Sequence, residues 1–128
     1  MEQALRYNDG KLQWSLVHYE SLEPMIRVLE YGAHKYSIFK DALGNEYKGS
    51  EVSISDVKEM NLTQVSSGRD NWKKPMDIKK ILESAQRHLA SIMDGEINDS
   101  DSGLSHMGHL MCNSLFYNYH VNENNRSK

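Results

Sequence analysis

The sequence predicts a small all-α helical bundle, and three observations support this fold class. Three long segments carry apolar residues at helical spacing, and no segment shows a secure strand pattern. A chain of 128 residues is expected to form a single domain over 1–128. Its hydrophobic share of 38% and mean hydropathy of −0.70 are low for an autonomous core. We therefore expect self-association into a homo-oligomer to add stability.

The first helix is predicted from about Ser21 to Tyr36, after an irregular lead-in. The turn signal Asn8-Asp9-Gly10 is followed by residues 11–17, which favour extended or irregular structure. Pro24 falls in the first helical turn, where its missing N–H costs little. The apolar side of this helix consists of Leu22, Met25, Ile26, Val28, Leu29 and Ala33.

Residues 37–68 differ from the rest of the chain, because they are polar and interrupted by glycines. The short Val/Ile alternation over 51–57 fits a small hairpin, and the composition also fits a mobile inserted loop. The sequence does not decide between the two. Loops of this length inside compact domains are usually functional or disordered.

Two further helices are predicted from Asp77 to Asp94 and from about Leu104 to His120, with the last eight residues frayed. Asp77 is suited to cap the first of these helices, and Gly95 is suited to end it. The acidic, turn-rich loop between Gly95 and Leu104 joins the two helices.

Composition excludes several classes of partner. The net charge is −3 with acidic and basic residues well mixed, so binding to duplex nucleic acid is not expected. No apolar run approaches 18 residues and the N-terminus lacks an apolar signal segment, so no membrane contact is expected. The single Cys112 excludes an intramolecular disulfide. Together these features favour a cytoplasmic protein.

A polar stripe on the third predicted helix is the first candidate site. His106, His109 and Asn113 lie at i, i+3 and i+7, so they project from one face and need partners such as carboxylates. The two imidazoles could share a transition metal or donate hydrogen bonds to a phosphate. They could also be helix histidines that are hydrogen-bonded to the acidic loop, and on spacing alone this interpretation is favoured over a ligand site.

Carboxylates at the start of the first helix are the second candidate. Glu20 and Glu23 lie three residues apart and could hold a hard cation that in turn binds phosphate oxygens. Acidic residues are also common at helix N-termini without any ligand. Glu23 and Glu30 form the safer pair on one face.

Cationic and aromatic side chains complete the candidates. Arg87, beside His88, could clamp a phosphate or could pair with Glu83 at the surface. For Lys11 and Lys35 the solvated interpretation is the default. Three aromatic residues outside the apolar stripes could stack on a nucleobase, although core packing is the default for each: Trp14, Tyr36 and Trp72.

Several segments occur together in the order and spacing of one family. They are RYNDGKLQWSLV from Arg6, Leu22-Glu23, EYGAHKY from Glu30, Asp70-Asn71-Trp72, QRHL from Gln86, DGEIND from Asp94 and SGLSHMGH from Ser102. Through these segments the chain resembles the phage and bacterial dATP/dGTP diphosphohydrolase family, a MazG-like group of all-α nucleotide pyrophosphohydrolases.

The resemblance implies a MazG-like helical bundle that oligomerises, uses Mg²⁺ and hydrolyses a purine deoxynucleoside triphosphate to the monophosphate and pyrophosphate. It assigns Glu20 and Glu23 as catalytic metal ligands. With this assignment we expect Glu30, and Asp99 or Asp101 from the acidic loop, as further ligands of the metal. His106 and His109 stand where MazG-like enzymes carry Glu-x-x-Asp. Because imidazoles are poor Mg²⁺ ligands, His106 is expected to contact phosphate during catalysis, or the metal is Mn²⁺-like.

The resemblance also implies the residues that hold the nucleotide. Phosphate contacts are expected from Lys11, Lys35, Arg87 and His106. The base is expected to be flanked by Trp14, Tyr36 or Trp72. The other expected substrate-binding residues are Asn71, His88, His109 and Asn113.

Two departures from the family pattern leave a second function open. About 30 residues separate the Lys35-Tyr36 ending of the first helix from Asn71-Trp72, which family members join almost directly. The imidazoles replace the expected acidic pair. The chain could therefore be a phage nucleotide-binding protein that sequesters a nucleotide or a cyclic-nucleotide immune signal in the host cytoplasm without hydrolysing it. A helical module without any ligand is the third alternative.

Overall fold

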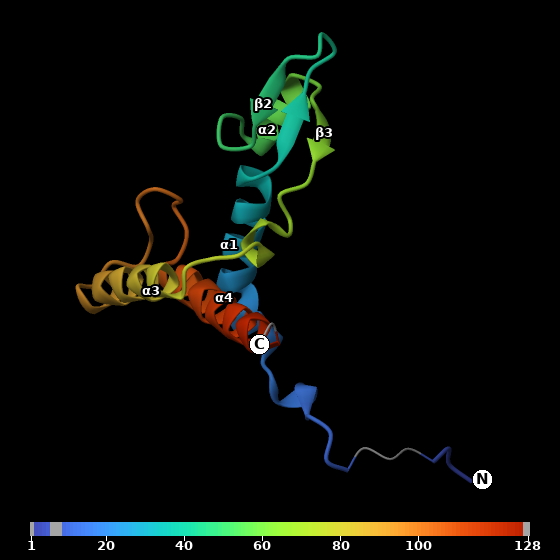
Figure 1. The fold of residues 1–128 in the computed structure, drawn as a ribbon, viewed down its shortest axis with the longest axis vertical. Helices are drawn as coiled ribbons and strands as arrows, with labels where there is room; N and C mark the ends of the chain where they lie inside the picture. Colours follow the sequence, from blue (N-terminus) through green and yellow to red (C-terminus); the bar gives the residue numbers. More distant parts are fainter. Residues whose placement is uncertain (1, 6–8, 127–128) are drawn as a thin grey trace.

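The computed structural model describes residues 2–5 and 9–126, and it combines helices with a small sheet (Figure 1). The all-α prediction is wrong, because the sheet makes this a mixed α and β fold. None of the described helices is long and apolar enough to cross a bilayer. In chain order the elements are η1 (Trp14–Leu16), η2 (Tyr19–Leu22), α1 (Glu23–Lys35), β1 (Ile38–Lys40), β2 (Glu46–Lys48), α2 (Ile54–Glu59), β3 (Thr63–Ser66), η3 (Asn71–Lys73), α3 (Ile78–Met93) and α4 (His106–Arg126).

Three long helices form the body of the molecule. α3 and α4 pack side by side, and the N-terminal half of α1 crosses α4 (Figure 1). The crossing is close because Gly108 has no side chain: a Cβ there would collide with the Pro24 carbonyl oxygen. One turn further along, the Cys112 thiol donates a hydrogen bond to the Met25 carbonyl oxygen over 3.3 Å. Buried apolar side chains of these helices are Val28, Ile81 and Cys112, and Phe39 and Val52 form a second buried group within residues 37–68.

The three predicted helices are confirmed, with shifted ends. The Asp77 carboxylate caps α3 by accepting a hydrogen bond from the Lys79 N–H over 2.9 Å, and Gly95 follows the helix with φ of +90°. α4 begins two residues later than predicted, because the Ser105 hydroxyl accepts the Gly108 N–H and caps the helix.

The predicted fraying after His120 is wrong over the described residues, since α4 continues to Arg126. Arg126 pairs with Glu123 at 2.9 Å, one turn earlier on the same helix, which supports the last turn. Residues 127–128 lie outside the described residues.

Residues 37–68 form an ordered insertion rather than a mobile loop. An antiparallel sheet with the strand order β2-β1-β3 contains the β1–β2 hairpin, so the hairpin alternative is confirmed. The alternation over 51–57 is not a strand. There Ser53 and Asp56 form a capping box that starts α2, and this local hydrogen bonding outweighs the Val/Ile pattern.

The insertion is fastened to the C-terminal end of α1. The Ser37 hydroxyl donates to the Ala33 carbonyl oxygen over 2.7 Å and accepts the Gly68 N–H over 2.9 Å. Phe39 is buried and packs on the His34 ring at 5.4 Å. The first and last residues of the insertion are therefore joined at one point, and the chain can leave α1 and return beside it.

Residues 9–22 lead away from the three helices as an extended arm (Figure 1). The irregular lead-in is confirmed, with η1 and η2 as single 3₁₀ turns and Gly10 in a turn with φ of +80°. Asn8 of the predicted turn lies outside the described residues. Large apolar side chains on the arm, including Leu12, Trp14 and Leu16, are mostly exposed.

Candidate functional site

A cavity of about 540 Å³ lies between α1, α3, the 94–105 loop and the start of α4. We call it the histidine cavity, because three of the six histidines of the chain line it. Its walls also carry the charged side chains of Lys35, Arg87, Asp99 and Asp101. The complete lining is Tyr31, Lys35, Ser84, Arg87, His88, Ser91, Asp99, Asp101, Ser102, His106 and His109.

Helical spacing brings these side chains together. On α3, Arg87 and His88 lie between Ser84 and Ser91, one turn to either side, so all four share the face turned to the cavity. The loop closes over this face through the Asp99 N–H, which donates to the Leu104 carbonyl oxygen over 2.7 Å.

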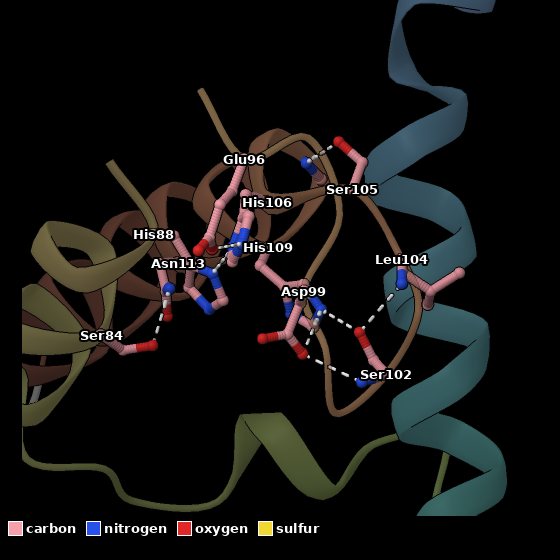
Figure 2. A network of polar contacts seen from close by, with 11 residues as sticks. Ser84, His88, Glu96, Asp99, Ser102, Leu104, Ser105, His106, His109 and Asn113 are labelled. Carbon is pink, nitrogen blue, oxygen red and sulfur yellow. Dashed lines mark hydrogen bonds and ion pairs between the residues drawn. The ribbon is translucent and has the colours of Figure 1, made fainter. Parts of the chain in front are cut away.

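The histidines contact one another as well as acidic groups (Figure 2). The Nδ1 atoms of His88 and His106 form a hydrogen bond of 2.9 Å, so one ring donates and the other accepts. His106 is buried, and its Nε2 lies 3.3 Å from the Glu96 carboxylate. The rings of His88 and His109 stack at 4.6 Å, nearly parallel. Each ring is thereby fixed in orientation.

Asp99 and Ser102 organise the other side of the cavity (Figure 2). The Asp99 carboxylate accepts the Ser102 N–H over 3.0 Å and lies 3.9 Å from His109 Nε2. The Ser102 hydroxyl forms a 2.7 Å hydrogen bond with the same His109 nitrogen and accepts the Leu104 N–H. The predicted need of the histidine stripe for acidic partners is met by Glu96 and Asp99.

Electrostatics favour neutral imidazoles beside an ionised carboxylate. Burial lowers the pKa of His88, and the neighbouring His109 and His106 lower it further. Burial also lowers the pKa of His109, against the opposing effect of Asp99. Burial alone would raise the pKa of Asp99, but hydrogen bonds from Ser102 and the nearby histidines outweigh it and lower that pKa. Neutral imidazole and carboxylate are the forms that bind metals.

One group of possible metal ligands stands out within residues 2–5 and 9–126. Donor atoms of His88, Asp99 and His106 all lie within 4.8 Å of one another, close enough to meet at a single ion. Two nitrogens and one carboxylate oxygen suit Mn²⁺ or another transition metal better than Mg²⁺, which prefers oxygen ligands. Of the four predicted metal ligands, only Asp99 belongs to this group.

The other predicted ligands lie elsewhere. Glu20 is in η2 and Glu23 is the exposed first residue of α1, and neither lines the histidine cavity. Glu30 faces a second cavity, beside the first. These three carboxylates remain predictions from the resemblance.

Of the predicted substrate-binding residues, the histidine cavity gathers Lys35, Arg87, His88, His106 and His109. Lys11 and Trp14 lie on the exposed arm. Tyr36, Asn71 and Trp72 line a smaller cavity of about 100 Å³ on another face of α1.

Two predicted binding side chains have structural partners instead. Trp72 stacks on Phe116 with ring centroids 5.1 Å apart, in the core-packing role that was its default. Asn113 is buried, donates a 3.1 Å hydrogen bond to the Ser84 hydroxyl and lines a separate cavity.

Sequence reasoning missed several lining residues. Tyr31 lies one turn before Lys35 on α1, and Ser84 and Ser91 flank Arg87-His88 at the same spacing. Extending each candidate by one helical turn would have found all three. Glu96 could not be assigned, because its contact with His106 depends on how the loop folds back.

Comparison with known proteins identifies the family of the chain. The family model described as "dATP/dGTP diphosphohydrolase, N-terminal" matches residues 1–128. Neither the curated proteins nor the solved structures include a match to the chain. Because the family model covers the whole sequence, the chain belongs to the dATP/dGTP diphosphohydrolase N-terminal family.

Proposed function

We propose that this chain hydrolyses a purine deoxynucleoside triphosphate to the monophosphate and pyrophosphate in the histidine cavity. The description of the family supports the substrate class. The observation that carries the proposal is that two positively charged side chains, Lys35 and Arg87, line one cavity together with three imidazoles and Asp99. Such a set can bind a polyanion and hold a water molecule beside it.

Phosphate binding is the role we assign to the basic side chains. The Arg87 guanidinium can bind two phosphate oxygens at once, while Lys35 supplies a point charge from α1 on the opposite wall. His109 can donate a hydrogen bond from a ring that Ser102 and stacking on His88 hold in place. Together these side chains offset the charge of the leaving pyrophosphate.

His88, Asp99 and His106 are the residues that would hold a divalent cation. Their donor set fits Mn²⁺ better than the Mg²⁺ implied by the resemblance, and Glu20, Glu23 and Glu30 are the alternative, oxygen-rich ligands. When bound, the ion would neutralise phosphate charge and acidify a water molecule.

In the chemical step, a water oxygen attacks the α-phosphorus in line with the bond to the bridging oxygen. That bond breaks, and pyrophosphate leaves with the bonding electrons. Where Glu20, Glu23 and Glu30 hold the ion, Asp99 is suited to take the proton of the water, because its carboxylate is then ionised and open to the cavity. The proton then passes to solvent.

We also propose that the chain acts as a homo-oligomer. Its accessible surface is 10406 Å². A compact monomer of 14.8 kDa exposes about 7,000 Å². The extended arm accounts for part of the excess, and unpaired apolar helix faces account for more.

Sequestration without cleavage is the second candidate function. The observation that favours it is the position of Glu20 and Glu23, which do not line the histidine cavity. A cavity with imidazoles and cations but without this acidic pair can bind phosphates and lack full catalytic power.

One experiment separates these functions. We would incubate the protein with dATP or dGTP and either Mg²⁺ or Mn²⁺, and measure released pyrophosphate. If the chain hydrolyses the nucleotide, pyrophosphate is released. The rate of release should then fall about 100-fold in Asp99→Asn and stay unchanged in the exposed control Asp94→Asn. Intact nucleotide recovered after denaturation supports sequestration, and neither product nor bound nucleotide contradicts both. Full activity in Glu23→Gln would remove Glu23 from the mechanism.

A further inference from the structure

A second cavity of about 690 Å³ lies beside the histidine cavity, between α1 and the insertion. One wall is the exposed side of α1, with Arg27, Glu30 and Tyr31. The opposite wall is the segment 49–54, which leads into α2 and which comes from the insertion, and Leu104 closes one edge. The insertion therefore supplies half of a cavity.

The two cavities meet along one helical turn. Tyr31 and Lys35 line both of them, and these residues lie at i and i+4 on α1. A ligand too long for one cavity can therefore extend past Tyr31 into the other. A nucleoside triphosphate has this form, since its phosphate chain and its base lie at opposite ends.

The wall from the insertion is held in place. The His34 Nε2–H donates a 2.6 Å hydrogen bond to the Val52 carbonyl oxygen, and Val52 itself is buried. The Gly49 N–H donates to the Ser37 carbonyl oxygen over 2.8 Å, and Gly49 lies so close to the His34 carbonyl that no side chain fits there. These contacts fix the segment 49–54 against α1 before any ligand binds.

The chemistry of the second cavity differs from that of the first. Tyr31, Leu104 and the 76% exposed Ile54 offer an apolar surface to a flat ring. Arg27 offers hydrogen-bond donors, and Glu30 and Glu51 offer acceptors at the rim. The charged groups are balanced alike in the two cavities, with Arg27 and Lys35 facing two carboxylates here and Lys35 and Arg87 facing two there. The imidazoles of His88, His106 and His109 line the histidine cavity and not the second one, so we place the phosphates in the histidine cavity and a neutral ring on the apolar surface of the second.

We propose that the segment 49–54 and the Arg27–Tyr31 turn of α1 form the subsite for the purine base and the sugar. This inference rests on the proposed function, because it takes the phosphates to lie against Lys35 and Arg87. The insertion then acts as a specificity element: it decides which base is accepted, while the helices bind the phosphates.

The first test compares Ile54→Asn with the matched control Leu43→Asn. Both positions carry exposed aliphatic side chains of the insertion, but Leu43 lies in the β1–β2 turn, outside the cavity. Calorimetry would measure the binding of dATP, dGTP and inorganic triphosphate to each protein. We expect Ile54→Asn to weaken binding of at least one deoxynucleotide about tenfold and to leave inorganic triphosphate unchanged. Leu43→Asn should change neither.

Unchanged deoxynucleotide binding in Ile54→Asn overturns the inference, as does an equal loss for inorganic triphosphate. Photolabelling of the unaltered protein with 8-azido-dATP gives an independent result. We expect label on Tyr31 or within 49–54, and label confined to other segments contradicts the subsite.

The outcomes also separate this inference from the proposed function. Pyrophosphate release together with unchanged binding in Ile54→Asn leaves hydrolysis standing and overturns the subsite. Loss of deoxynucleotide binding in Ile54→Asn without pyrophosphate release by the unaltered protein upholds the subsite and overturns hydrolysis. No binding of any deoxynucleotide overturns both.

Discussion

In the proposed function, the protonation of two histidines determines which ligands the histidine cavity can bind. His88 and His109 stack on each other, and a positive charge on both rings would be repulsive. Burial and the neighbouring imidazoles keep the pKa of each below the ordinary value of 6.5. Near neutral pH the pair therefore offers lone pairs to a cation or N–H groups to a phosphate. In acid the rings are protonated and can no longer offer lone pairs to a cation.

Lowering the pH is expected to destabilise the fold from about pH 6.5 downward. The unfolded chain protonates His88 and His109 near pH 6.5, while the folded chain, with lower pKa values, does not. The unfolded state then binds more protons, so the free energy of unfolding falls with pH. Asp99 contributes stability that is present above pH 3.8 and is lost only as the pH falls through its lowered pKa.

Urea unfolding at pH 7.5 and 5.5 measures this dependence. The double variant His88→Asn/His109→Asn should lose less stability between the two pH values than the unaltered protein. The unaltered protein and the double variant share all the other histidines. An equal loss of stability in the two proteins would therefore assign the acid sensitivity to groups other than His88 and His109.

The single thiol is expected to be inert in the folded protein. Cys112 is 1% exposed, and burial raises the pKa of its thiol to about 12. Only the thiolate reacts with disulfide reagents, so DTNB should not label the native chain and should label it fully in guanidinium chloride. Rapid labelling under native conditions would show that the crossing of α1 and α4 opens.

At the scale of elements, the fold depends on how closely α1 approaches α4. Gly108→Ala would place a Cβ against the Pro24 carbonyl oxygen and 3.2 Å from a Val28 methyl group. We expect a loss of about 1–3 kcal/mol from this overpacking. Gly32→Ala is the matched control, since nothing lies within 4 Å of a Cβ there and the helix should gain about 1 kcal/mol.

Chemical denaturation of the two glycine variants tests the crossing. Opposite changes in the unfolding midpoint, downward for Gly108→Ala and upward for Gly32→Ala, are the expected result. Stabilisation in both variants would mean that the helices separate more readily than the close contact suggests.

Elements differed in how far the sequence could predict them. α3 was predicted almost to the residue, because its apolar period, the Asp77 cap and Gly95 are all local signals. The strands of the insertion are three or four residues long, too short for a visible alternation. Their pairing depends on Phe39 packing against His34 from another element, which no local pattern contains.

The same division holds for the site. His106 and His109 were found from their spacing on α4, and Arg87 and His88 from their place on α3. The contact between His88 and His106 was not predictable, because it depends on the register in which α3 and α4 pack. The metal ligands implied by the family resemblance also differ from the group that the fold brings together, because that group too depends on how α3, α4 and the loop between them pack.

At the scale of the whole molecule, α3 presents an apolar stripe that the described chain covers only in part. Leu82, Leu89 and Met93 are 44%, 47% and 79% exposed and lie at i, i+7 and i+11, so they share one face. The total accessible surface exceeds that of a compact monomer of this mass by roughly half. An obligate interface buries roughly 1,000–2,500 Å² of each partner, so the excess is large enough for one, and the extended arm accounts for part of the remainder.

A second copy of the chain is therefore expected to cover the stripe. Light scattering coupled to gel filtration at micromolar concentration should give a multiple of 14.8 kDa. Leu89→Lys places a charge at the centre of the stripe and should shift the mass toward that of the single chain, because a buried unpaired charge is costly at an interface. Leu43→Lys, at the exposed hairpin turn, should leave the mass unchanged. An unchanged mass in Leu89→Lys would mean that the stripe is not the interface. A single-chain mass for the unaltered protein would mean that the chain is a monomer and that its low apolar content suffices for folding alone.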